Sequence, residues 1–377
     1  MALHRLGRLF ALPLAILAAG CSSTPDTTKP KVLAEIASPV PVREIWRRGF
    51  SAGDIYVFHP SVRGTTVFVA GSDGQVVRFD DGLQTWSVAP AKALSGGVAA
   101  NERMLVVGSL KGEVLAINTE DGSVMWRSQL GAEIVAPAAF SDDQVIVRTG
   151  DNRLFALDAR DGRRRWVYQR PIPALSIRVT AAPVVADRLV FAGYPGGKLI
   201  AVNAQSGQVV WEGTVALPKG ATELDRMADV VALPVLGAKD ICAVAHLGRV
   251  TCFDLIGGTQ VWTRDVSSTA GLAIDHKSVY VSDDQGVVHA FDRVSGGTLW
   301  KQDKLQNRRL TGPFLNQGFV VVADDQGLLH VLDRENGAFR GRFSVEAGRV
   351  DSDLRAYEGG FVMLTRNGLL VAMQIAP

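Results

Sequence analysis

The chain lacks a bias of charge and, after its N-terminal segment, a long apolar run. Its 377 residues contain 40 basic and 38 acidic side chains, so the formal net charge is only +2. This near balance provides no basic surface for nucleic acid, and we expect no nucleic-acid partner. Beyond the N-terminus, no stretch is long and apolar enough to span a bilayer. The composition therefore argues against a nucleic-acid-binding role and against a membrane-spanning mature chain.

The chain also lacks the residue patterns of an active site. No Ser, His and Asp arrangement stands out, and no glycine loop follows the strand-to-helix pattern that cradles phosphate. His289 and His330 each follow a turn glycine by three residues, but no third metal ligand recurs at that position. The Asp-Asp-Gln-Gly sequences at 283–286 and 324–327 lack the longer acidic pattern of a calcium loop, so we interpret them as turns. We expect no catalysis, metal, cofactor or small-molecule substrate.

What the chain does contain is a regular series of tryptophans. Successive tryptophans are separated by 40, 40, 40, 45, 51 and 38 residues. They are Trp46, Trp86, Trp126, Trp166, Trp211, Trp262 and Trp300. A self-similar unit of roughly 40 to 45 residues with short β patterns is typical of a propeller blade. Because the tryptophan has the same place in each unit, we interpret it as packing between blades and not as a ligand cage.

Each unit has the pattern of a strand meander. Apolar runs rich in β-branched residues alternate with glycine and aspartate turns, as in residues 105–118. Tight hairpins need positive φ, which glycine adopts at little cost, so we expect Gly112 and its equivalents, such as Gly248, to form the turns. One unit departs from the pattern, because Gly341 stands where tryptophan is expected. We expect that blade to pack a different aromatic, with Phe339 and Phe343 adjacent, or to make a weaker contact.

The two ends of the chain hold complementary parts of one unit. Residues 361–373 form a hairpin pattern that stops before any tryptophan strand, whereas residues 43–46 form a tryptophan strand with no hairpin before it. We therefore expect the N-terminal strand to complete the C-terminal blade and close the ring. The predicted fold class is all-β, an eight-bladed β-propeller of four-stranded blades closed by pairing of the N- and C-terminal segments.

The N-terminus has the three parts of a secretory signal peptide. Basic residues within 4–8 precede an apolar segment at 9–17 and a run of small residues that ends at Cys21. This run resembles a bacterial lipobox, which implies cleavage before Cys21 and diacylation of its thiol. Ordinary signal peptidase cleavage is the alternative, since Ala18 replaces the commoner leucine. Ser22 in place of aspartate indicates sorting to the outer membrane.

These features divide the chain into three parts. We expect residues 1–20 to be a lipoprotein signal peptide, residues 21–36 a lipid-anchored flexible tether and residues 37–377 the propeller. The other two cysteines, Cys242 and Cys252, fall on the two strands of one expected hairpin. A periplasmic location permits a disulfide, but a register shifted by one residue would misalign the pair. A disulfide and two buried thiols both remain open.

The repeat resembles that of pyrroloquinoline-quinone propellers. It consists of Ala-x-Asp or Ala-x-Asn, then a glycine, then tryptophan four residues later, as in Ala116 to Trp126 and Ala290 to Trp300. Two families share it. The quinoprotein dehydrogenases are longer and commonly carry adjacent paired cysteines and a calcium-binding constellation, which this sequence lacks. The second family is the BamB family of lipoproteins, which this sequence resembles over essentially the whole chain, from the lipobox to the ring closure.

The resemblance to the BamB family implies a function and a location. It implies a non-catalytic scaffold of the BAM complex that binds the periplasmic domains of the barrel subunit BamA and assists insertion of β-barrel proteins. It also implies a lipid anchor at Cys21 on the periplasmic face of the outer membrane. A quinone-cofactor propeller enzyme, or another envelope-anchored propeller scaffold with a different partner, remains the alternative.

Two connections between units are longer than the others. The intervals from Trp166 to Trp211 and from Trp211 to Trp262 exceed 40 by 5 and 11 residues. The surplus lies between each tryptophan strand and the next unit's first strand, around residues 171–178 and 223–229. Equivalent places in neighbouring blades lie on one face, and such insertions usually map to the binding face. Loops that merely pack on each other are the alternative interpretation.

The resemblance to the BamB family also implies which residues of these connections contact BamA. Its Leu-x-apolar-Arg element matches Leu175, Ile177 and Arg178. Asp229 matches the first of two family aspartates, whereas the second position is Val231, a departure for which Asp225 is the candidate replacement.

Removing the thiol of Cys21 tests the lipid anchor. We expect Cys21→Ser to abolish lipid attachment and to release the protein from membranes, because two acyl chains are needed for stable anchoring. Fractionation of the envelope measures this, in a strain that lacks the partner. If the variant still fractionates with the outer membrane there, the lipobox interpretation is wrong.

Overall fold

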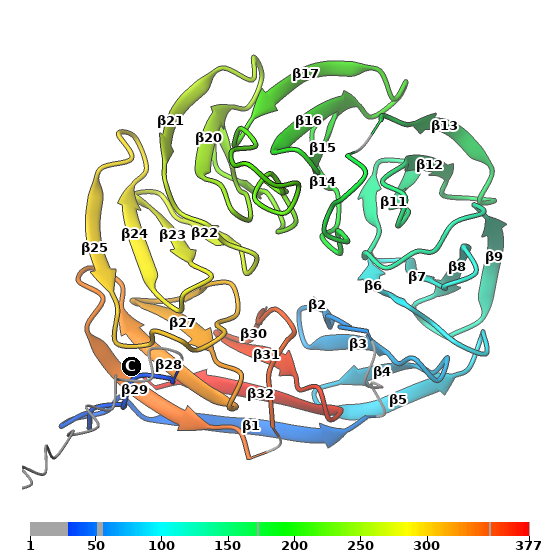
Figure 1. The fold of residues 1–377 in the computed structure, drawn as a ribbon. Coiled ribbons are helices and arrows are strands. Elements are labelled where there is room, and N and C mark those ends of the chain that lie inside the picture. The colour runs from blue at the N-terminus through cyan, green and yellow to red at the C-terminus, as the bar shows by residue number, and fades with distance from the viewer. Residues whose placement is uncertain (1–28, 51–55, 172, 347, 377) are drawn as a thin grey trace, which may run out of the picture.

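The structure, a computed structural model, describes residues 29–50, 56–171, 173–346 and 348–376, and their regular elements are all β-strands. These strands form eight four-stranded sheets, which stand as blades around a ring (Figure 1). The predicted fold class is therefore confirmed. The signal peptide and Cys21 lie outside the described residues. No helix in the described part of the chain is long and apolar enough to cross a membrane.

We number the blades in chain order and give the strands of each from the centre outward. Blade 1 contains β2 (Ser61–Arg63), β3 (Thr66–Ala70), β4 (Val76–Asp80) and β5 (Leu83–Val88). Blade 2 contains β6 (Gly96–Ala100), β7 (Met104–Gly108), β8 (Glu113–Asn118) and β9 (Val124–Gln129). Blade 3 contains β10 (Ala139–Ser141), β11 (Gln144–Arg148), β12 (Leu154–Asp158) and β13 (Arg164–Tyr168). Blade 4 contains β14 (Val184–Ala186), β15 (Leu189–Tyr194), β16 (Lys198–Asn203) and β17 (Val209–Thr214).

The second half of the ring repeats this arrangement. Blade 5 contains β18 (Val235–Leu236), β19 (Asp240–Val244), β20 (Val250–Asp254) and β21 (Gln260–Arg264). Blade 6 contains β22 (Leu272–Ile274), β23 (Ser278–Ser282), β24 (Val288–Asp292) and β25 (Thr298–Gln302). Blade 7 contains β26 (Phe314–Asn316), β27 (Phe319–Ala323), β28 (Leu328–Asp333) and β29 (Phe339–Ser344). Blade 8 contains β30 (Arg355–Tyr357), β31 (Gly360–Leu364), β32 (Leu369–Ile375) and β1 (Val42–Gly49).

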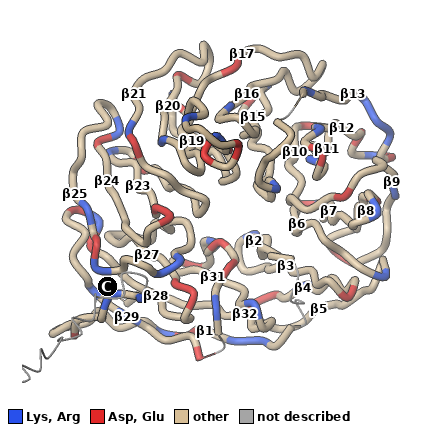
Figure 2. The backbone as a smooth tube through the Cα atoms, viewed as in Figure 1, with Lys and Arg blue, Asp and Glu red and all other residues tan. Residues whose placement is uncertain are grey.

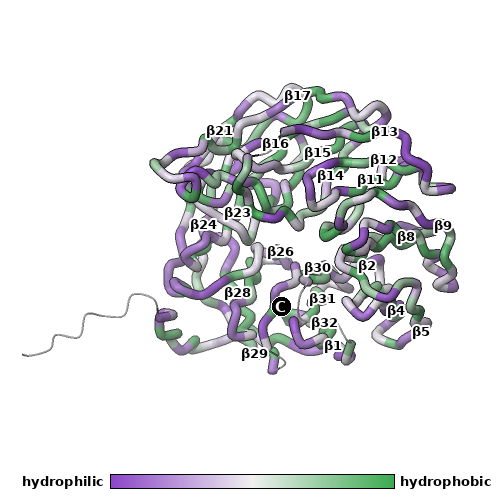
Figure 3. Tube along the Cα trace, turned by 45° about the vertical axis from the view of Figure 1, so that its right-hand side comes forward, coloured by the Kyte–Doolittle hydropathy of each residue, from purple (hydrophilic) through white to green (hydrophobic). Residues whose placement is uncertain are grey.

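The core is divided among the spaces between blades. The middle strands are buried on both faces, and every residue of β11 and β12 is buried. In the outer strand β13, by contrast, only Trp166 is buried. Figure 3 shows hydrophobic stretches within the blades all around the ring. Each blade therefore depends on its two neighbours to cover its apolar faces.

The two ends of the chain close the ring as predicted. β1 pairs antiparallel with β32 from Val42 opposite Ile375 to Gly49 opposite Leu369, with one irregularity between Glu44 and Trp46. Figure 1 shows the blue β1 beside the red β32. Because the outer strand of blade 8 comes from the N-terminus, blade 8 cannot form without both ends of the propeller.

Each tryptophan docks on the blade that follows it. The clearest example is Trp126 of blade 2, where a Cβ added to Gly162 of blade 3 would lie 2.5 Å from the indole. The indole Nε1 donates a hydrogen bond to the carbonyl of Ala159 at 2.9 Å. Five other tryptophans donate in the same way to a backbone carbonyl of the next blade. The tryptophans therefore pack between blades, as the repeat predicted.

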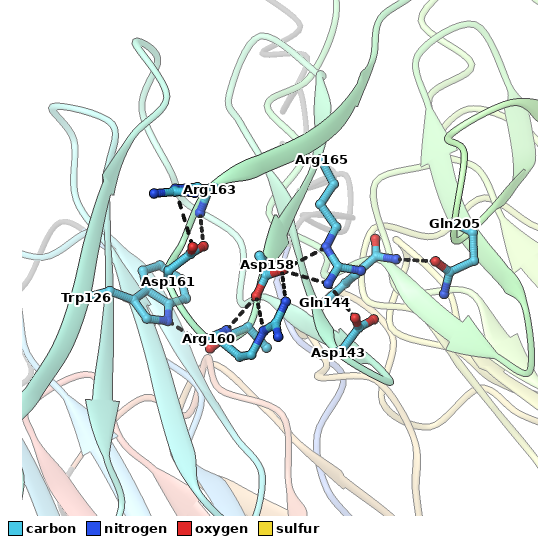
Figure 4. A network of polar contacts seen from close by, with 10 residues as sticks. Trp126, Asp143, Gln144, Asp158, Arg160, Asp161, Arg163, Arg165 and Gln205 are labelled. Carbon is cyan, nitrogen blue, oxygen red and sulfur yellow. Dashed lines mark hydrogen bonds and ion pairs between the residues drawn. The ribbon is translucent and has the colours of Figure 1, made fainter.

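Charged side chains stabilise the turn that receives the indole. In blade 3, Asp158 accepts hydrogen bonds from Arg160 and Arg165 (Figure 4). These two guanidinium groups hold the pKa of Asp158 well below its usual range. The same carboxylate accepts the backbone N–H of Arg160, so it closes the turn while it binds two arginine side chains. The turn thus presents Gly162 to Trp126 in a single conformation.

Blade 7 has no tryptophan because blade 8 has no turn to receive one. The chain ends meet at that place, where β32 ends and β1 begins. Val40 fills the space, and a Cβ added to Gly341 would lie 3.1 Å from Val40 Cγ2. Val40 N also donates to the Arg340 carbonyl at 2.7 Å. Val40, and neither flanking phenylalanine, lies nearest to Gly341, so the substitute comes from the N-terminal segment.

The N-terminal segment continues along blade 7. Lys31 N donates to the carbonyl of Gln306 at 3.1 Å, and the Lys31 carbonyl accepts from Arg308 at 3.3 Å. The Ala34 carbonyl accepts from Arg342 at 3.1 Å. Residues 29–34, within the expected tether of residues 21–36, therefore contact the propeller.

The two cysteines of blade 5 form a disulfide. Cys242 lies opposite Cys252 in the strand register, so the structure decides between the two alternatives that the sequence left open.

A matched pair of glycine substitutions isolates the docking of tryptophan on glycine. Gly162 and Gly131 have φ of 73° and 76°, but nothing lies within 4 Å of a Cβ added to Gly131. Gly131→Ala should cost about 1–2 kcal/mol of unfolding free energy from backbone conformation alone. Gly162→Ala should cost about 1–3 kcal/mol more, because the new methyl collides with Trp126. Urea denaturation measures both, and equal losses would mean that the indole contact does not limit stability.

Candidate functional site

One face of the ring carries the connections between blades and the turns between the second and third strands of each blade. We call it the loop face. It carries both long connections, the first loop (residues 169–183, between β13 and β14) and the second loop (residues 215–234, between β17 and β18). Residue 172 of the first loop lies outside the described residues. In a strand meander these two kinds of connection fall on the same side, so the two loops are neighbours.

A buried carboxylate joins the two loops. Asp229 of the second loop is 1% exposed. Its side chain accepts the N–H of Ile177 in the first loop at 2.7 Å and the N–H of Gly196 at 2.9 Å. Its own carbonyl accepts the N–H of His246 at 2.8 Å. One residue thus connects the first loop, the β15–β16 turn and the β19–β20 turn.

The burial of Asp229 changes the role that we expected for it. A carboxylate with this little exposure and two internal donors is not presented to a partner. It instead fixes the backbone at Ile177, and with it the direction of the side chains on either side. Val231, at the second family position, is also buried, with 8% exposure. Its departure from aspartate therefore changes the interior of the loop and not its polar surface.

The first loop presents Leu175 and Arg178 outward. Leu175 is 41% exposed, whereas Ile177 is partly buried. The Arg178 side chain is 52% exposed and forms an ion pair at 2.6 Å with Glu133, which lies in the connection between blades 2 and 3. This pair holds the guanidinium over the loop face while half of the side chain remains in water. The three residues of the first loop that were expected to contact a partner therefore lie together, and two of them are accessible.

Asp225 folds the tip of the second loop. Its carboxylate accepts the N–H of Thr222 at 3.1 Å, and its own N–H donates to the Thr222 hydroxyl at 3.2 Å. The Thr222 hydroxyl lowers the pKa of Asp225. Asp225 remains exposed, and the same tip exposes Leu224. The structure does not bring Asp225 to Asp229, whose carboxylate faces inward.

Sequence reasoning missed Leu247, at the tip of the β19–β20 turn. We expected Gly248 to provide the positive φ there, but Leu247 does so, with φ of 48°, and Gly248 does not. Leu247 N donates to the Ser267 hydroxyl at 2.8 Å, and the side chain is 50% exposed. The sequence did hold one indication. The residue before the turn glycine, or before Asn152, is polar or glycine in the other seven copies and is leucine only here.

Four exposed leucines on the loop face make up what we call the apolar patch. We define it as Leu175, Leu217, Leu224 and Leu247, which are 41%, 65%, 62% and 50% exposed. The β19–β20 turn, which carries Leu247, lies against the second loop, because a Cβ on Gly248 would lie 2.7 Å from Cβ of Ala216, the residue before Leu217. Figure 2 shows acidic and basic residues interspersed around the ring, so no field of one sign marks this face. Exposed apolar side chains with charged neighbours are typical of a protein contact.

The central cavity is a weaker candidate for a binding site. It has a volume of about 1100 Å³ and is lined by the inner ends of all the blades. Several charged residues of its wall pair with one another, since Asp351 pairs with Arg349 and Arg366, and Asp353 with Arg355. No group of three metal-ligating side chains occurs among the described residues.

The two histidines considered as metal ligands bind turn aspartates instead. His289 Nε2 lies 2.8 Å from Asp283, and His330 Nε2 lies 3.0 Å from Asp324. Each aspartate also accepts two backbone N–H groups within its own turn. The interpretation of the Asp-Asp-Gln-Gly sequences as turns is confirmed. Burial lowers the pKa of His330, which favours the neutral imidazole.

The chain is similar to known proteins over nearly its whole length. The family model described as outer membrane protein assembly factor BamB matches residues 72–302 and 284–376. A relative of that name from Bordetella pertussis (strain Tohama I) is 39% identical, over 94% of this chain and 93% of its own length. Relatives of the same name from Nitrosomonas eutropha and Escherichia coli (strain K12) are 37% and 31% identical, over 98% and 95% of this chain and 95% and 96% of their own.

Solved structures agree on the fold. The crystal structure of BamB from Moraxella catarrhalis has a TM-score of 0.83 and 25% identity, and the match covers 89% of this chain and 100% of that one. A quinohemoprotein alcohol dehydrogenase from Pseudomonas putida HK5 has a TM-score of 0.71 at 12% identity, over 89% and 76% of the two chains. The second likeness shows the fold alone. The relatives matched along the sequence are named as assembly factors and not as enzymes. The chain belongs to the BamB family of outer membrane protein assembly factors.

Proposed function

We propose that this propeller is a non-catalytic scaffold of the BAM complex and that its loop face binds the periplasmic domains of BamA. The observation that carries the proposal is the pair of long neighbouring loops, joined inside by Asp229 and presenting Leu175 and Arg178 outside. A rigid ring with a small apolar patch and an accessible arginine suits a docking surface. In this role the protein assists the insertion of β-barrel proteins without reacting with them.

The proposal includes attachment to the outer membrane. Cleavage of residues 1–20 leaves Cys21 as the lipid-bearing residue, on the periplasmic side. The chain from Cys21 to Lys29 spans at most about 30 Å when extended. Lys29 and Lys31 contact Asn307 and Gln306, which belong to the connection between blades 6 and 7. That connection lies on the loop face, so the described part of the tether begins on the side that carries the proposed BamA contacts.

Truncation of the outward residues of the first loop tests BamA binding. Leu175→Ala combined with Arg178→Ala should weaken binding by about 2 kcal/mol or more, since both side chains are exposed at the proposed contact. The melting curve should shift little, because exposed loop substitutions usually change stability by about 0.5 kcal/mol. A binding titration against the purified periplasmic domains of BamA, with a thermal melt of each variant, measures both effects.

Two control variants sharpen this test. Leu83→Ala with Arg103→Ala removes an exposed leucine and an exposed arginine from the opposite face and should leave affinity unchanged. Glu133→Ala removes the internal ion pair but keeps Arg178, so it separates a partner contact of the arginine from its intramolecular role. Unchanged affinity in the Leu175 and Arg178 double variant would remove the first loop from the interface.

Asp229→Ala tests whether this residue positions the loops. The substitution leaves the N–H groups of Ile177 and Gly196 without their acceptor, so the first loop should detach and BamA binding should weaken. Hydrogen exchange should accelerate at these two amides. A direct contact role predicts weaker binding with unchanged exchange at both amides, and that result would return Asp229 to the interface.

A further inference from the structure

We propose that Leu247 is a partner-contacting residue, so that the interface extends from the two long loops to the β19–β20 turn of blade 5. This inference rests on the function proposed above and adds a residue that the family motif does not include. A contact through Leu247 requires an apolar surface on the partner. Three observations on this turn carry the inference: its backbone conformation, its connection to Asp229 and its exposure.

The backbone of Leu247 has a conformation that leucine rarely adopts. Its φ of 48° is left-handed, and for leucine this is a clear outlier. The equivalent turns of the other seven blades use glycine or asparagine at positive φ, namely Gly74, Gly112, Asn152, Gly197, Gly286, Gly327 and Gly368. The next residue is Gly248, yet its φ is not positive, and Leu247 has the strained conformation instead. Strain of this kind is retained where the surroundings enforce it, and it concentrates at functional sites.

Named contacts enforce this conformation. The N–H of His246 donates to the carbonyl of Asp229 at 2.8 Å, and the N–H of Leu247 donates to the Ser267 hydroxyl at 2.8 Å. His246 Nδ1 also lies 3.0 Å from a carboxylate oxygen of Asp284 in blade 6. The turn is therefore held from two sides, by the second loop and by the next blade. The backbone carbonyl of Asp229 thus holds the residue before Leu247, whereas its carboxylate holds Ile177.

Leu247 is therefore exposed to solvent on the loop face, which carries the proposed contact. Leu247 is 50% exposed, and Leu217 and Leu224 of the adjoining second loop are 65% and 62% exposed. The polar rim beside it includes Arg249, which forms an ion pair with Asp265 and so needs no partner of its own. Apolar side chains inside a polar rim are the usual composition of a protein interface. Because this turn adjoins the second loop, the proposed occupant of the patch is an apolar surface of the periplasmic domains of BamA.

Substitution of Leu247 should weaken binding without lowering the melting temperature. Leu247→Gly and Leu247→Asn both relieve the left-handed strain, so the melting temperature should equal or exceed that of the unsubstituted protein. Both remove the apolar contact, so the Kd for the purified periplasmic domains of BamA should rise about tenfold. Leu247→Met keeps an apolar side chain and should bind within about twofold of the unsubstituted protein. Ile256→Asn, in the same blade on the opposite face and 80% exposed, is the matched control.

The outcomes distinguish this inference from the proposed function. Weak binding by Leu247→Gly and Leu247→Asn, with intact melting and with normal binding by Leu247→Met and Ile256→Asn, supports the contact. Normal binding by Leu247→Gly and Leu247→Asn, beside weak binding by the Leu175 and Arg178 double variant, overturns the contact and leaves the proposed function standing. Absence of binding by the unsubstituted protein overturns both.

Discussion

The contact on which the rest of the structure depends is an indole laid against a turn glycine of the next blade. Trp126 on Gly162 is the clearest case, with its Nε1 bonded to the Ala159 carbonyl. The contact needs a positive-φ residue without a Cβ on one side and a wide flat ring on the other. Repeated around the ring, it sets the spacing between blades and buries the middle strands on both faces. A single unit has neither neighbour, so the fold is stable only as a closed array.

Closure explains the one irregular unit. The blade that joins the two ends has no turn between its third and fourth strands, and so it has no glycine to receive an indole from blade 7. The preceding blade has Gly341 at the tryptophan position, and Val40 from the N-terminal segment covers it. The same segment then follows blade 7 toward the loop face, where Arg308 and Arg342 bind its carbonyls. The place of the chain termini, the packing of blade 7 and the path of residues 31–40 are thus consequences of one break in the repeat.

The proposed interface separates positioning from contact. Asp229 is buried and holds backbone groups of the first loop, the β15–β16 turn and the β19–β20 turn. Leu175 and Arg178 lie beside Ile177, whose N–H the carboxylate accepts, and Leu247 lies beside His246, whose N–H the Asp229 carbonyl accepts. This arrangement lets a rigid scaffold present loops with little conformational freedom to lose on binding, which favours affinity.

The sequence alone determined the number of blades, the closure by β1, the docking role of the tryptophans and the existence of two long loops. Each of these features is visible in the sequence as part of the repeat or as a departure from its spacing, because every unit repeats the same local contacts. Only the tertiary structure decided that Asp229 points inward, that Leu247 and not Gly248 takes positive φ, that Val40 covers Gly341, and that Cys242 and Cys252 are in register. These depend on contacts between residues far apart in the chain or on the exact pairing of two strands. Periodicity carries no information about such contacts, because each occurs only once in the ring.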